Sequence, residues 1–119
     1  MPSRPALILV VDDDEPTRDA TAERLKDAGF EVRGASNGRD ALELLATLRP
    51  DLIILDWKMP VMSGEELLAA LRADASLASI PAVILTALRP WEITVMDATI
   101  LHKPVQMKEL LKVVSARLR

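Results

Sequence analysis

The chain has 119 residues, half of them apolar, and a formal net charge of −3. This length predicts one domain covering residues 1–119, and two Trp, one Phe and no Tyr leave a core of mainly aliphatic side chains. The acidic balance gives no electrostatic reason to bind nucleic acid or an anionic membrane, and the lack of cysteine excludes disulfides, thiolate metal sites and cysteine nucleophiles.

The first half of the chain alternates strand and helix patterns. Leu7–Val11 is a β-branched, apolar run that predicts a buried strand, and it is too short for a signal peptide or a membrane span, so we expect a cytoplasmic protein. A helix capped by Asp14 or Glu15 should run to about Ala28. Residues 30–35 predict a weaker strand. The next helix shows helical spacing of its apolar residues, Ala41, Leu44, Leu45 and Leu48.

The strand predicted for residues 52–55 organises the rest of the chain. Its continuous apolar run is typical of a strand buried on both faces in the middle of a parallel sheet. The run ends in Asp56, and Pro60 and Gly64 then indicate a loop. Because ligands of open α/β sheets bind beyond the carboxyl ends of the strands, Asp56 is a candidate for chemistry.

The second half repeats the alternation. We expect a helix over residues 64–72, a strand at Ala82–Thr86, one or two helical turns within residues 90–96, and a strand at Thr99–His102. The last helix has the clearest apolar stripe of the chain, formed by Met107, Leu110, Leu111, Val114 and Leu118. Five strands alternating with helices predict a parallel sheet with right-handed crossovers.

Polar residues follow several of these strands and should meet at one edge of the sheet. Asp12 and Asp13 follow the first strand and Asp56 ends the third, while Thr86 and Lys103 come after the fourth and fifth. Clustered carboxylates repel one another unless a cation neutralises them, and oxygen ligands favour a hard ion such as Mg²⁺. A hydroxyl and an ammonium beside that ion are good donors to a phosphoryl group.

The same residues closely resemble the receiver domains of two-component response regulators. The matching motifs lie in the order of that family and cover almost the whole chain: Val10-Val11-Asp12-Asp13-Asp14, Asp56 with Met59-Pro60 and Gly64, Thr86-Ala87, and Lys103-Pro104. The resemblance implies a flavodoxin-like, doubly wound five-stranded sheet of order 2-1-3-4-5. It also implies a cis peptide bond between Lys103 and Pro104.

The resemblance further implies a phosphoacceptor, not an enzyme. Asp56 would take a phosphoryl group from a histidine kinase or a phosphotransfer protein, and Thr86 and Lys103 would hydrogen-bond its oxygens. Mg²⁺ would be held by Asp13, Asp56 and the backbone carbonyl of Lys58, with Asp12 acting mainly through a metal-bound water. We expect a monomer or weak dimer that switches partner binding, without nucleic-acid or membrane contact by this domain.

Two departures from the family pattern concern signal output. Ile100 and Val105 stand where the family usually has aromatic residues, the first of them a switch coupled to the threonine. The interval between Thr86 and Lys103 is also shorter than usual, which predicts a fourth helix shortened by more than a turn.

Several alternatives remain open at this point. The aspartates after the first strand could simply cap a helix, which is our interpretation of Asp14. His102 is interpreted as a strand residue without a role, and Trp91 as either a cover for the shortened region or part of a contact surface. Two other functions are considered: a hydrolase of the haloacid dehalogenase type, suggested by Asp12-x-Asp14, and a receiver-like module that binds partners without phosphorylation.

Overall fold

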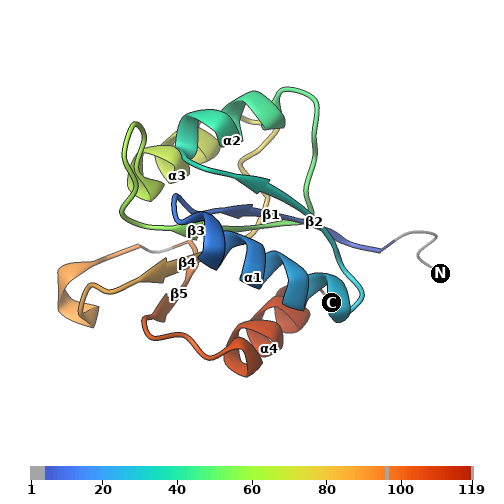
Figure 1. Ribbon diagram of the computed structural model, residues 1–119. Coiled ribbons are helices and arrows are strands. Elements are labelled where there is room, and N and C mark those ends of the chain that lie inside the picture. The colour runs from blue at the N-terminus through green and yellow to red at the C-terminus, as the bar shows by residue number, and fades with distance from the viewer. Residues whose placement is uncertain (1–4, 96, 119) are drawn as a thin grey trace.

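The computed structural model describes residues 5–95 and 97–118, and its centre is a parallel β-sheet of five strands (Figure 1). The strand order is β2-β1-β3-β4-β5, as expected. The strands are β1 (Leu7–Val11), β2 (Glu31–Ala35), β3 (Leu52–Asp56), β4 (Ala82–Thr86) and β5 (Thr99–His102).

Helices cover both faces of this sheet. They are α1 (Glu15–Asp27), α2 (Gly38–Leu45), α3 (Gly64–Ala73) and α4 (Met107–Arg117), with a short 3-10 helix, η1 (Pro90–Glu92). Figure 1 shows α2 and α3 on one face, and α1 and α4 on the other. The doubly wound, flavodoxin-like architecture predicted from the sequence is therefore confirmed. None of the helices in the described part of the chain has the length and apolar character needed to traverse a lipid bilayer.

Two separate apolar clusters hold the layers together. Along β3, Ile53 and Leu55 pack with residues of α2 and α3, whereas Leu52 and Ile54 pack with residues of α1 and α4. Every residue of β3 and β4 is buried, as expected for parallel strands covered on both faces. The ends of these strands are thus the places where polar chemistry can reach solvent.

Local sequence signals fix where the helices begin and end. Asp14, Asn37 and Ser63 each accept a hydrogen bond from a backbone N–H of the first turn, and Glu66 completes a capping box with Ser63. Such caps typically contribute about 1 kcal/mol each. After α1, Gly29 has φ of 100°, a left-handed conformation that glycine adopts without a steric penalty.

The connection between β4 and β5 departs most from a regular crossover. The expected shortening of its helix is confirmed and goes further, because among the described residues of this segment the only helical structure is the single turn η1, with no buried residue. Residue 96, within the range predicted to hold helical turns, lies outside the described residues. Ile93 anchors the segment in the apolar cluster beneath α3. Arg72 of α3 holds its far end, donating from Nε to the Asp97 carboxylate (2.7 Å) and from Nη2 to the Asp97 carbonyl (3.0 Å).

Candidate functional site

Three carboxylates meet at the carboxyl end of the sheet, as the sequence predicts. Asp12 and Asp13 lie in the turn after β1, and Asp56 is the last residue of β3. Each offers an oxygen, and these oxygens all lie within 4.8 Å of one another. Asp12 and Asp56 are only 5% and 7% exposed, whereas Asp13 is open to solvent. The cluster is therefore a half-buried, oxygen-only pocket with one open side.

Lys103 supplies the positive charge of this pocket. Its Nζ lies 2.8 Å from Oδ1 of Asp56, and its backbone N–H donates to the Thr86 carbonyl at 2.7 Å. The peptide bond to Pro104 is cis, as the family resemblance implies. The ammonium thus lies against Asp56 while its backbone is tied to the end of β4.

The electrostatics of the pocket favour a bound cation. Burial raises the pKa of the Asp12 carboxyl above its ordinary value of 3.8, and the charges of Asp56 and Asp13 raise it further. The backbone N–H of Asp14 and the Lys103 ammonium oppose these effects but do not outweigh them. A cation bound beside Asp12 would therefore favour the ionised form of this carboxyl group. Carboxylate oxygens without His or Cys suit a hard ion such as Mg²⁺, so the donor set fits the expected metal.

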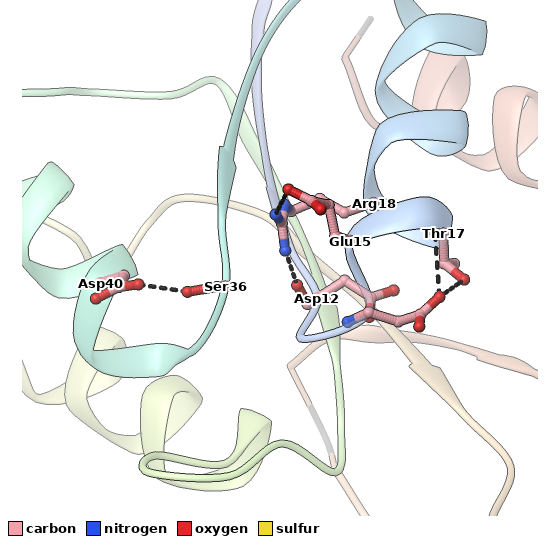
Figure 2. Close-up of polar contacts among 7 residues, drawn as sticks. Asp12, Glu15, Thr17, Arg18, Ser36 and Asp40 are labelled. Atoms are coloured by element: carbon pink, nitrogen blue, oxygen red, sulfur yellow. Dashed lines mark hydrogen bonds and ion pairs between the residues drawn. The ribbon is translucent and has the colours of Figure 1, made fainter.

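The β1–α1 turn that carries Asp12 is held by its own backbone and by Arg18 (Figure 2). The Asp14 N–H donates to Oδ1 of Asp12 at 2.9 Å, and Nη1 of Arg18 donates to the Asp12 carbonyl at 2.7 Å. The stem of Arg18 lies against Gly34 of β2, and its Nη2 is 3.9 Å from Glu15. Sequence reasoning missed Arg18, because an arginine on an amphipathic helix gives no signal of such a contact.

Asp14 caps α1, which confirms its interpretation as a helix cap. Its carboxylate accepts hydrogen bonds from both the hydroxyl and the backbone N–H of Thr17, and these bonds lower the pKa of Asp14 (Figure 2). Figure 2 also shows the Ser36 hydroxyl donating to Asp40 at the start of α2. Because Asp14 is occupied as a cap, its position does not support the hydrolase alternative, which needs both aspartates of the Asp12-x-Asp14 pair.

The loop after β3 folds tightly back on Asp56. The Trp57 N–H donates to the Leu85 carbonyl at 3.0 Å, and the Trp57 carbonyl accepts from the Gly64 N–H at 3.0 Å. A Cβ at Gly64 would lie 2.4 Å from the backbone oxygen of Asp56, so only glycine fits there. Lys58, whose carbonyl is an expected metal ligand, lies on this loop with its side chain exposed.

Thr86 lies beside this pocket at the end of β4, and two of its neighbours were not expected. It is 2% exposed, and its Oγ1 accepts a hydrogen bond from the Leu88 N–H at 3.0 Å. Nδ1 of His102 lies 2.8 Å from the Leu88 carbonyl oxygen. The interpretation of His102 as a residue without a role therefore overlooked a side-chain contact with the loop after Thr86.

The two positions that depart from the family pattern lie on opposite faces of the sheet. Ile100 is half-buried against the cluster beneath α2 and α3. Val105 packs on the opposite cluster and lines a cavity together with Asp12 and Lys103. Trp91 is 74% exposed, with the Arg89 guanidinium 5.4 Å from its ring centroid. This exposure argues against the interpretation of Trp91 as a cover for the shortened region, and its part in a contact surface stays a prediction.

Comparison with known proteins agrees with this geometry. Residues 8–115 match the model of the response regulator receiver domain. The chain is 42% identical over 80 residues to the phosphate regulon transcriptional regulatory protein PhoB of Pseudomonas aeruginosa, covering 67% of this chain and 35% of that protein. It is 38% identical over 120 residues to the response regulator MprA of Mycolicibacterium vanbaalenii, covering 97% of this chain and 51% of that protein. The chain thus spans about half, or less, of the length of these two relatives.

Solved structures also match this chain, and here the match covers most of the length of both chains. The chemotaxis response regulator CheY4 of Vibrio cholerae is 35% identical with a TM-score of 0.89, covering 96% of this chain and 99% of that one. The signal receiver domain of a signal transduction histidine kinase from Syntrophus aciditrophicus is 31% identical with a TM-score of 0.88, covering 95% and 89% of the two chains.

Proposed function

The chain belongs to the response regulator receiver domain family, and we propose that its Asp56 accepts a phosphoryl group from a histidine kinase or a phosphotransfer protein. The family makes it a phosphoacceptor module of two-component signal transduction, not a turnover enzyme. The observation that carries the proposal is the cluster of Asp12, Asp13 and Asp56 within 4.8 Å, with Lys103 Nζ 2.8 Å from Asp56.

The transfer needs little acid–base chemistry. An oxygen of Asp56 attacks the phosphorus of a phosphohistidine in line with the P–N bond, so an O–P bond forms and the P–N bond breaks, leaving histidine. Catalysis of such transfers rests on positioning and on neutralising the charge of the phosphoryl oxygens. The Lys103 ammonium and the Thr86 hydroxyl are the donors that we assign to those oxygens. Burial of Asp56 supports this role, because electrostatic interactions with the phosphoryl oxygens are stronger where the site is partly shielded from water.

Mg²⁺ is the metal that we assign to the carboxylate cluster. Asp13, Asp56 and the backbone carbonyl of Lys58 would hold it, with Asp12 close by. When bound, it supplies positive charge that offsets the carboxylates and the phosphoryl oxygens. The raised pKa of Asp12 supports the assignment, because burial, and after it the charges of Asp56 and Asp13, disfavour the ionised carboxylate, and a bound cation would offset these effects. The proposed setting is the cytoplasm, with the phosphodonor protein as the upstream partner.

Intact-mass measurement tests the acceptor. Incubation with acetyl phosphate and Mg²⁺ should add one phosphoryl group to the wild type, and hydroxylamine should remove it, as expected for an acyl phosphate. Asp56→Asn should gain none while keeping its fold by circular dichroism. Asp19→Asn, which removes an exposed charge from α1, is the matched control and should react like the wild type. A full-stoichiometry adduct on Asp56→Asn would overturn the assignment.

A second candidate function is partner binding without phosphorylation. The observation that favours it is the single turn η1 between β4 and β5, combined with Ile100 in place of an aromatic residue. No adduct on the folded wild type, with either acetyl phosphate or a phosphorylated phosphotransfer protein, would support this candidate against the first.

A further inference from the structure

We propose that His102 is a positioning residue for phosphoryl recognition, acting through Leu88 on the hydroxyl of Thr86. The inference rests on the proposed function and extends it to a residue outside the acidic pocket. His102 is the register partner of Thr86 across β4 and β5. Its Nδ1 lies 2.8 Å from the Leu88 carbonyl oxygen, and the Leu88 N–H donates to Thr86 Oγ1 at 3.0 Å.

The direction of each hydrogen bond follows from the chemistry of its atoms. A backbone carbonyl oxygen only accepts, so Nδ1 of His102 carries the proton in its contact with Leu88. A threonine hydroxyl has one proton and two lone pairs. Because the Leu88 N–H occupies one lone pair of Thr86 Oγ1, the hydroxyl proton remains available to another acceptor. Thr86 is 2% exposed, so the Leu88 amide, and not bulk water, orients this hydroxyl.

His102 matters because it binds the end of the β4–β5 connection that adjoins Thr86. Ile93 packs into the apolar cluster in the middle of this connection, with Leu88 partly buried against the same cluster. Arg72 holds the far end at Asp97. At the near end, His102 fixes the carbonyl of Leu88 within two residues of Thr86. Ile100 has no polar group with which to make such a contact. Coupling between the loop and the acceptor therefore runs through the hydrogen bonds of His102 and Leu88.

The test is the rate of phosphorylation by acetyl phosphate in the presence of Mg²⁺. His102→Ala removes the donor and should slow the reaction about two- to five-fold, the range expected for one hydrogen bond at an exposed position. His102→Asn carries an amide N–H close to the position of Nδ1 and should restore most of the rate. Urea midpoints of all variants check that the fold is intact.

A double-mutant cycle separates positioning from a general structural effect. If His102 acts through Thr86, then His102→Ala should cause no further slowing once Thr86→Ala is present. In parallel, amide exchange at Leu88 should be faster in His102→Ala and normal in His102→Asn.

Three results would overturn the inference alone, each with a reactive wild type. They are an unchanged rate in His102→Ala, an equal slowing in the Thr86→Ala background, and failure of His102→Asn to restore the rate. A folded wild type that takes no phosphoryl group would instead overturn the proposed function, and this inference with it.

Discussion

Replacing Asp12 with asparagine should stabilise the metal-free protein, although it removes a residue of the proposed site. Asp12 is 5% exposed, and its carboxylate lies within 4.8 Å of those of Asp13 and Asp56. At that separation each repulsion amounts to about 1 kcal/mol at the dielectric constant of water and about 3.5 kcal/mol at an effective value near 20. Asparagine keeps an oxygen that can accept the Asp14 N–H, so the turn should retain its hydrogen bond.

The net gain in the free energy of unfolding should be smaller than the sum of the two repulsions. Lys103 attracts Asp12 and is lost as a partner in the variant, so we expect about 1–2 kcal/mol of added stability near neutral pH. For a chain of this size, that corresponds to a rise in melting temperature of about 3–10 °C.

The gain should also depend on pH with a definite sign. The folded protein raises the pKa of Asp12 above 3.8, so it binds this proton more tightly than the unfolded chain does. The contribution of Asp12 to wild-type stability therefore falls as the pH rises from 3.8 through the raised pKa, and the advantage of asparagine appears over that window. Towards pH 3.8 and below, the two proteins should converge.

Thermal unfolding in the presence of EDTA, followed by circular dichroism at several pH values, measures both effects. Asp19→Asn makes the same change of charge at an exposed position of α1 and should leave the melting temperature nearly unchanged. A lower melting temperature for Asp12→Asn, or a rise equal to that of Asp19→Asn, would refute the reasoning.

Other expected outcomes concern the metal, the loop after β3 and the hydrogen bonds between Arg72 and Asp97. Mg²⁺ at about 100 times its Kd should stabilise the wild type by about 2.7 kcal/mol, whereas Asp13→Asn should lose most of this response in calorimetry; an unchanged wild-type melting curve would contradict the metal assignment. Gly64→Ala should cost about 2–3 kcal/mol in urea unfolding, because its Cβ would meet the Asp56 backbone oxygen at 2.4 Å; a neutral effect would show that the loop can relax. Arg72→Met should speed amide exchange in residues 93–95 and lower the free energy of unfolding by about 2 kcal/mol. The reason is that the guanidinium donates hydrogen bonds to Asp97 and to the carbonyls of Ala78 and Ile80. Amide protection equal to that of the wild type would refute this.

The sequence was sufficient to predict the strands and their parallel arrangement, because the signals for these features are local and strong. The bounds of β1, β4 and β5 match their predicted ranges, since each contains a run of apolar residues that ends at a polar one. Parallel strands then bring their carboxyl ends together by topology alone. This is why Asp12, Asp13 and Asp56 could be grouped before their distances were known.

The contacts that the sequence did not predict are long-range and involve ordinary residue types. Arg72 reaches Asp97 from another element, and Arg18 bonds the backbone of the β1–α1 turn, yet either residue would look the same on a solvated helix face. The contact of His102 depends on where the Leu88 carbonyl lies, which is set by the path of an irregular loop. Periodicity carries no information about such paths, so these partners required coordinates.

The two tryptophans give the protein a pair of intrinsic fluorophores in contrasting surroundings. Trp57 follows the proposed acceptor and is 9% exposed, whereas Trp91 is 74% exposed beside Arg89. A buried indole should emit at shorter wavelength and resist quenching by acrylamide, while an exposed one should emit at longer wavelength and be quenched readily. Events in the acidic pocket and rearrangements of the β4–β5 connection can therefore be followed as separate optical channels in one unlabelled sample. In Trp91→Phe only the fluorescence of Trp57, beside the acidic pocket, would remain. In Trp57→Phe only the fluorescence of Trp91, in the β4–β5 connection, would remain.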